Sequence, residues 1–139
     1  MRTIKFKAKN RIREWVKGDL LQHLDGTVYI GENEGPWTDD GLCHSDYTHV
    51  EIVDSDTVCQ FTGFTDKNGK EIYEGDVIHI GPDYCVVIWV EDLGGFYLEA
   101  DYAKLPLGAM LHRYDFNVIG NIYEQKWTMR VKVSQRKEG

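Results

Sequence analysis

Hydrophobic and polar side chains alternate at the start of the chain. Ile4, Phe6 and Ala8 are separated from one another by single lysines. Because the side chains of a β-strand point alternately to its two faces, this pattern predicts a strand with one buried and one solvated face. Two further β-prone runs, residues 20–24 and 27–30, flank an Asp-Gly pair and predict a β-hairpin. The first part of the chain is therefore expected to be rich in β-structure.

The segment QFTGFTDKNGKEIYEGDVIHI, residues 60–80, combines two turn signals with three short β-prone runs. The Asp, Asn and Gly residues of these turns favour hydrogen bonds from side chains to turn amides and backbone conformations with positive φ. The order strand, turn, strand, turn, strand predicts a β-meander. The residues expected to build its turns are Asp66, Asn68, Gly69, Gly75 and Asp76.

The pattern predicts further strands after the meander. The apolar run over residues 84–90 predicts a well-buried strand, and residues 96–99 and 117–123 predict two more. Between these strands, Pro106 is placed to open a short helix that ends at His112. The chain is therefore expected to be mainly β.

A polar break at residues 54–56 separates two groups of predicted elements. We expect an N-terminal β-rich subdomain over residues 1–57, a barrel-forming part over residues 58–125, and a basic extension over residues 126–139. Within the first part, residues 31–47 are rich in glycine and acidic residues and show no hydrophobic period, which predicts a long loop.

The C-terminal extension has an alternation of its own. Met129, Val131 and Val133 alternate with Arg130 and Lys132, as in an amphipathic strand. Because a lone strand is not stable in water, its apolar side must pair within this subunit or with another one. Strand addition between subunits would make the three apolar residues an oligomer-forming tail, and a basic tail without fixed structure is the alternative.

The composition is ordinary for a soluble globular protein, with 139 residues, 42% of them hydrophobic and 28% charged. There is no apolar run of membrane-spanning length and no signal-peptide pattern, so we expect no membrane association and a cytoplasmic location. Three cysteines without CxxC spacing predict buried free thiols rather than a bound metal. A zinc site formed by Cys43, His44, His49 and Cys59 is the alternative.

The net charge of −7 is distributed unevenly along the chain. Residues 1–20 carry +5 and residues 126–139 carry +4, whereas residues 21–60 carry −9 and residues 61–125 carry −7. Basic ends are typical of segments that contact nucleic acid. They also complement the acidic body of the same or a neighbouring subunit, which is the interpretation we favour here.

No motif of a known type of catalytic site is present. The chain lacks the nucleophile elbow, the zinc-protease helix motif, the phosphate-binding loop and the dinucleotide fingerprint, so we expect neither an enzyme nor a cofactor. Aromatic residues are plentiful, and most should fill the core of a small barrel. The aromatic residues that we expect to contact a partner are Trp37, Tyr73, Trp89 and Tyr97.

Three motifs resemble those of the YopX family, small proteins of phages and prophages in bacteria. They are IKFKA near the start, TVCQFTGFTDKNGKEIYEGDVI in the middle and IGNIYE near the end, and their spacing covers residues 3–124. The resemblance implies an SH3-like barrel in the second half and self-association, and it implies no catalytic residues. Cys59 stands where the family pattern has glycine, and the tail after Glu124 matches no part of the pattern.

Together these observations predict a non-enzymatic, self-associating protein-interaction module of phage or prophage origin. Its partners would be further copies of itself and a host or phage protein. The alternative function is nucleic-acid binding through the basic terminal segments. The residues that would carry this alternative are Lys5, Lys7, Lys9, Arg130 and Lys132.

Overall fold

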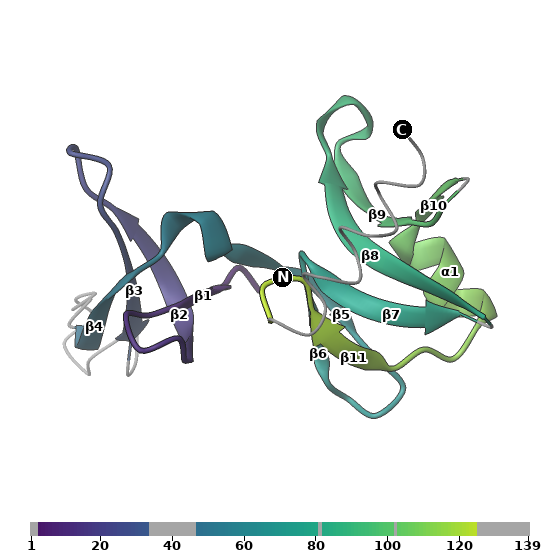
Figure 1. Ribbon diagram of the computed structural model, residues 1–139, viewed down its shortest axis with the longest axis horizontal. Coiled ribbons are helices and arrows are strands. Elements are labelled where there is room, and N and C mark those ends of the chain that lie inside the picture. The colour runs from purple at the N-terminus through teal and green to yellow at the C-terminus, as the bar shows by residue number, and fades with distance from the viewer. Residues whose placement is uncertain (1–2, 34–46, 81, 102, 125–139) are drawn as a thin grey trace, which may run out of the picture. The chain divides into compact units, whose positions relative to one another are not determined.

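The computed structural model describes residues 3–33, 47–80, 82–101 and 103–124. These residues form eleven β-strands, two 3₁₀-helices and one short α-helix, and all strand pairings are antiparallel (Figure 1). The prediction of a mainly β protein is confirmed. Within the described ranges, no helix has the length and apolar character required to cross a bilayer.

The chain divides into two compact units, residues 1–60 and residues 61–139. The predicted boundary after residue 57 lies three positions before this division. Trp37 and the residues of the C-terminal extension lie outside the described residues, so the structure carries no information on their predicted roles.

The first unit is an antiparallel sheet in the order β4-β3-β2-β1, to which the start of β5 adds a short pairing. The predicted hairpin forms between β2 and β3, and the loop after β3 falls mostly outside the described residues. The strands are β1 (Phe6–Lys9), β2 (Trp15–Gln22), β3 (Val28–Asn33), β4 (Tyr47–Val53) and β5 (Cys59–Thr65), and the 3₁₀-helix η1 (Ser55–Thr57) precedes β5.

The predicted alternation decides which face of the first sheet is buried. The inner face carries small and β-branched residues that pack into one core, while the lysines of β1 point to the opposite face. That opposite face is less solvated than predicted, since Lys7 is only 8% exposed. Gly18 permits a close approach of β2 and β3, because a Cβ atom there would lie 2.2 Å from the carbonyl oxygen of Gly31. The core residues of this unit are Ala8, Val16, Val28, Ile30 and Val53.

The second unit contains an antiparallel sheet in the order β10-β9-β8-β7-β11. The β5–β6 hairpin precedes it, and a short α-helix follows β10. The elements are β6 (Glu71–Tyr73), β7 (Asp76–Ile80), β8 (Asp83–Val90), η2 (Glu91–Leu93), β9 (Gly95–Glu99), β10 (Lys104–Pro106), α1 (Leu107–Arg113) and β11 (Val118–Asn121). The three strands and two turns predicted over residues 60–80 form, but they are not a meander, because β6 pairs with β5 whereas β7 pairs with β8 and β11 of the other sheet. The short helix forms after Pro106, as the sequence predicts.

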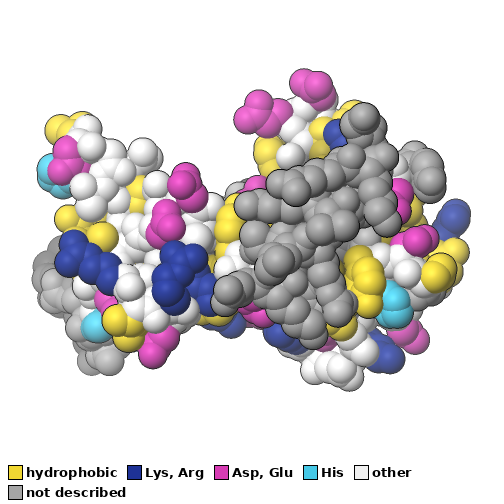
Figure 2. Space-filling view, viewed as in Figure 1, with side chains coloured by type: hydrophobic (Ala, Val, Ile, Leu, Met, Phe, Trp, Pro, Cys, Tyr) yellow, Lys and Arg dark blue, Asp and Glu magenta, His cyan; other side chains and the backbone are white. Residues whose placement is uncertain are grey.

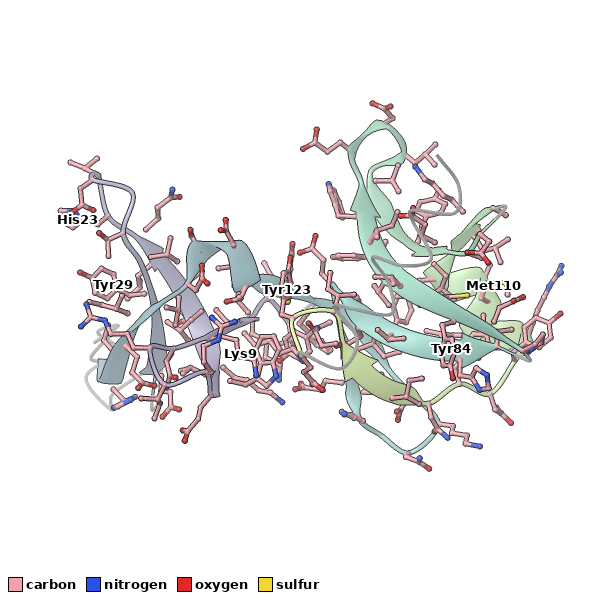
Figure 3. All side chains as sticks on the ribbon, viewed as in Figure 1. Lys9, His23, Tyr29, Tyr84, Met110 and Tyr123 are labelled. Carbon is pink, nitrogen blue, oxygen red and sulfur yellow. The ribbon has the colours of Figure 1, made fainter. Side chains whose placement is uncertain are left out.

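One face of this second sheet, which we call the inner face, is covered by α1 and the segment that follows it. Leu107 from the helix and Phe116 from the following segment are both buried against the sheet. Met110 of α1 packs at the border of this core (Figure 3). The buried residues of the cluster are Ile72, Ile78, Cys85, Val87, Leu98, Leu107 and Phe116.

The strands of the second unit do not close into the SH3-like barrel expected from the sequence. Among the described residues, β10 and β11 are the two edges of the sheet, and no pairing joins them. These edge strands have only three and four residues, so they offer little backbone for closure. Helix α1 covers the inner face instead, which leaves a sheet packed on one side by a helix.

Candidate functional site

The predicted turn residues of segment 60–80 have structural roles. The carboxylate of Asp66 accepts hydrogen bonds from the backbone amides of Asn68 and Lys70, each at 2.9 Å, and from that of Val118 at 3.1 Å. Burial by itself would raise the pKa of Asp66, but these donors and the charge of Lys70 outweigh it and lower the pKa. Gly69 closes the turn with φ 83°.

The second turn is held from inside the unit. Asp76 is 1% exposed, and its Oδ2 accepts a hydrogen bond of 2.7 Å from the amide of Tyr73. Gly75 has φ 85°, and its own amide donates to the carbonyl of Val87 at 2.7 Å. In the first turn, Nδ2 of Asn68 donates a hydrogen bond of 2.9 Å to Oδ1 of Asn117. These contacts indicate that this segment builds structure.

The structure separates the aromatic residues that were expected to contact a partner. Tyr73 is 1% exposed and packs against Phe61 with ring centroids 5.5 Å apart, so it belongs to the interior and not to the surface. Trp89 is 44% exposed and makes an edge contact with Phe96 at 5.0 Å. Tyr97 is half-buried, and the β8–β9 register puts it on the face opposite to Trp89. Trp89 and Tyr97 therefore do not form one surface.

The face of the second sheet that points away from α1 is a candidate surface that the sequence did not reveal. We call it the outer face. The register puts Ile88 opposite Tyr97 and Val86 opposite Glu99, whereas Cys85 and Val87 point inward. The residues of the outer face beyond buried Val77 are His79, Tyr84, Val86, Ile88, Val90, Tyr97 and Glu99.

Aromatic and aliphatic side chains dominate the outer face. Tyr84 is 46% exposed and stacks on His79 with ring centroids 4.9 Å apart (Figure 3). Hydrophobic and histidine side chains lie side by side on the visible face of this unit in Figure 2. Val86, Ile88 and Val90 are half-buried, and Glu99 at one end is exposed. An apolar centre beside charged groups is the usual composition of a protein-interaction surface.

The first sheet brings basic residues of two strands around one aromatic ring. On the face opposite to its core, Lys9 lies opposite Trp15 and Lys7 lies opposite Lys17. The ammonium groups of Lys7 and Lys9 each lie 4.5 Å from the ring centroid of Trp15, which is the geometry of a cation–π contact. We call these four residues the lysine–tryptophan cluster. Figure 2 shows Lys and Arg side chains on the visible face of this unit.

The turn between β1 and β2 positions this cluster. Oδ1 of Asn10 accepts hydrogen bonds from the amides of Ile12 at 3.1 Å and Glu14 at 2.9 Å. Arg13 adopts φ 65°, and its carbonyl accepts a 3.2 Å hydrogen bond from Nζ of Lys9. The turn thus orders the end of β1, where Lys9 lies (Figure 3). No sequence signal pointed to this turn, because Arg is not a residue that favours positive φ.

Candidate metal ligands are not assembled within the described ranges, where no group of three His, Cys, Asp or Glu side chains could hold an ion. Cys43 and His44 of the alternative zinc site lie outside these ranges. Cys59 and Cys85 are buried free thiols, and the Sγ of Cys59 donates to the carbonyl of Thr57 at 3.3 Å. Burial, with the nearby charges of Asp83 and Asp101, raises the pKa of Cys85.

Comparison with protein-family models identifies a match. The family model described as YopX protein matches residues 5–127, which is most of the chain. No curated protein matches the sequence. The match spans both units described above, including the lysine–tryptophan cluster and the outer face.

Proposed function

The chain belongs to the YopX family, and we propose that it acts without catalysis as a self-associating protein-interaction module. The observation that carries this proposal is the outer face of the second sheet, where Tyr84, Ile88 and Tyr97 present apolar area at the surface. The proposal includes a phage or prophage origin and a cytoplasmic site of action.

The outer face has the properties of an anchor surface. Tyrosine offers a large apolar area at a low cost in conformational entropy, and it is enriched among the residues that dominate binding energy. Stacking on His79 restricts the Tyr84 ring before a partner arrives, so less freedom is lost on binding. Val86 and Ile88 extend the apolar area along β8. A rigid strand therefore presents a row of side chains to a flat partner.

Self-association is the second part of the proposal. The tail carries three apolar residues at alternate positions and a charge of +4, whereas residues 61–125 carry −7. Opposite charge favours the approach of the tail to the body of a neighbouring copy, and the apolar residues Met129, Val131 and Val133 would supply the contact. A host or phage protein is the further partner that we expect.

Matched charge insertions test the outer face. Tyr84→Lys places a charge on this face, and Leu93→Lys places the same charge at a 59% exposed position in η2, which is not part of the sheet. We expect light scattering to show a smaller mass for Tyr84→Lys than for the unchanged protein and for Leu93→Lys. Circular dichroism checks that both variants are folded. A monomeric mass for the unchanged protein at high concentration would overturn self-association.

Nucleic-acid binding through the basic segments is a second candidate function. The observation in its favour is that β1 keeps its lysines on the face opposite to the core, where Lys7 and Lys9 surround Trp15. Lys5 precedes the strand and continues this row. Arg130 and Lys132, which would extend the basic area, lie outside the described residues.

A further inference from the structure

We infer that the open edge of β4 in the first unit binds the C-terminal extension of a neighbouring copy as an added β-strand. The inference rests on the proposed self-association and specifies where the tail binds. It is carried by the sheet order, by the exposed apolar residues of β4 and by the alternation of residues 129–133.

β4 is the end strand of the first sheet, and it lies at the border of that unit in Figure 1. One side of β4 pairs with β3 along the strand. On the other side, the described residues supply a single isolated bridge, between Asn10 and Val53 at the end of β4. The rest of this edge has no neighbouring strand among the residues that the structure describes.

The backbone groups of this edge point toward an incoming strand. The amide of Asp54 donates to the carbonyl of Lys9 at 2.8 Å, so it points away from β3. Because backbone amides alternate in direction along a β-strand, those of Ile52 and Val50 point the same way. Both residues can therefore form backbone hydrogen bonds with an added strand.

The composition and length of β4 leave its edge open to pairing. Natural edge strands are protected by lysine, proline, bulges or short length. β4 has seven residues, and none of them is lysine or proline. The irregularity in its pairing with β3 is confined to the start of β4, opposite Glu32 and Asn33. The edge strands of the second sheet have only three and four residues.

Exposed apolar side chains border this edge. Val50 and Ile52 are 47% and 36% exposed on the face opposite to the core. The β3–β4 register continues this apolar row with half-buried Tyr29, which lies opposite Ile52 (Figure 3). The first β-turn and β4 also form a groove of about 240 Å³. The residues that line this groove are Asn10, Arg11, Ile12, Glu51 and Ile52.

The C-terminal extension matches the edge in its period. Its apolar residues Met129, Val131 and Val133 recur at alternate positions, as Val50 and Ile52 do. Residues at alternate positions of a strand share one face of the sheet that the strand joins. An added tail can thus place its apolar residues beside those of β4 and its basic residues on the opposite face.

Net charge favours the approach of the tail to the first unit. Residues 126–139 carry +4. Residues 1–60 together carry −4, because the +5 of residues 1–20 offsets part of the −9 of residues 21–60. Opposite charge steers association, and added salt weakens this effect.

The charges beside the edge itself are balanced. Glu51 alternates with Val50 and Ile52, so it lies on the face that the basic residues of the tail would share. Its carboxylate lies 3.2 Å from Nε2 of His49, and Arg11 lines the same groove. We therefore expect backbone hydrogen bonds and apolar contacts to supply most of the affinity, with a moderate dependence on salt.

Cross-linking of the full-length protein tests the site. An aliphatic amino acid with a photoreactive diazirine replaces Val50, and this protein is mixed with unmodified protein that carries nitrogen-15. Mass spectrometry then separates cross-links between copies from those within one chain. We expect cross-links from position 50 to residues 127–135 of the nitrogen-15 chain. The same amino acid at Leu24, which is 103% exposed between β2 and β3, is the control and should give none.

Two substitutions test the edge by a second route. Val50→Lys introduces the side chain that commonly protects natural edges, and Val50→Pro removes an amide that points away from β3. We expect each to raise the dissociation constant of self-association roughly tenfold in light scattering, because an anchor contact is lost. Leu24→Lys adds the same charge elsewhere in the unit and should leave the constant unchanged. Circular dichroism checks that each variant is folded.

The outcomes separate the site from self-association as such. Cross-links confined to one chain would overturn docking between copies, and a lack of cross-links from position 50 to the tail would overturn the tail as the occupant. An unchanged dissociation constant in every folded Val50 variant would overturn the site. In each of these cases, a mass above that of the monomer leaves the proposed self-association in place. A monomeric mass for the unchanged protein would overturn both.

Discussion

Asn121 donates a hydrogen bond of 2.9 Å from its Nδ2 to Oδ1 of Asp76, and each of the two residues is 1% exposed. The pair joins the start of β7 to the end of β11, 45 residues later in the sequence. Oδ1 of Asn121 in turn accepts from the amide of Tyr123 at 3.0 Å. The hydrogen bond thereby links a predicted turn residue at the start of β7 to the last described strand.

Removal of Asp76 should strongly destabilise the second unit. Asp76→Ala leaves the buried amides of Tyr73 and Asn121 without this acceptor, which costs about 2–4 kcal/mol of unfolding free energy. Urea denaturation of Asp76→Ala, Asn121→Ala and the double variant measures the coupling. We expect the effects to be clearly less than additive. Additive effects would show that the two side chains do not act as a pair.

Gly75 should tolerate a side chain less well than Gly63 does. Both residues have positive φ, 85° and 91° respectively, so alanine at either position costs about 1–2 kcal/mol in backbone strain. A Cβ atom at Gly75 would also lie 3.3 Å from Nδ2 of Asn121. A Cβ atom at Gly63 would have no neighbouring heavy atom within 4 Å. We expect Gly75→Ala to melt at a lower temperature than Gly63→Ala, and Gly75→Val to melt lower still. Equal melting temperatures would show that crowding by Asn121 is unimportant.

The local elements could be predicted because their signals are local. Alternation near Phe6 and Ala8 identified a strand and its core-facing side, and the residues Asp66 and Gly75 marked two turns correctly. The pairing of the strands around those turns was predicted wrongly, because β6 and β7 lie in different sheets. The SH3-like barrel predicted for the second half is not confirmed, and the sheet there is open, because closure depends on the edge strands and on what covers the inner face. Leu107 lies on the helix that covers that face.

The residues that share each candidate surface are determined by the register between paired strands, which cannot be obtained from the sequence alone. Residues 84–90 are almost all apolar, so they show no alternation between apolar and polar positions. The sequence therefore does not indicate that Val87 is buried and Ile88 half-buried. The opposition of Lys7 and Lys17 depends on a turn in which Arg13 adopts positive φ. Neither relationship can be obtained from residue types alone, because each one is fixed by pairing between strands.

The carboxylate of Asp66 should contribute stability at neutral pH that disappears in acid. Its pKa in the folded state is lower than the ordinary value of 3.8. Burial alone would raise this pKa, but the hydrogen bonds from backbone amides and the charge of Lys70 stabilise the carboxylate more strongly. The contribution is therefore complete above the unfolded-state value and is lost as the pH falls below 3.8 through the folded-state pKa.

The variant Asp66→Ala isolates this contribution. At pH 7 it should lower the unfolding free energy by about 2 kcal/mol, since the residue is buried and accepts three backbone hydrogen bonds. The difference from the unchanged protein should stay constant down to about the unfolded-state value of 3.8 and shrink as the pH falls below it through the lower folded-state pKa. Urea denaturation at each pH measures it, with Asp115→Ala as a control for removal of an exposed carboxyl. A difference that stays constant with pH would contradict the assigned shift.

Removal of residues 126–139 should lower the oligomeric state of the protein. The deletion removes the apolar residues Met129, Val131 and Val133 together with a charge of +4, which are the groups proposed to contact a neighbouring copy. Light scattering of the truncated and full-length chains measures the mass. A full-length variant with Met129 and Val131 changed to serine separates the apolar contribution from the charge, because it keeps every basic residue. An unchanged mass in both proteins would remove the tail from the account of self-association, and a loss confined to the truncated chain would assign the contact to the basic residues.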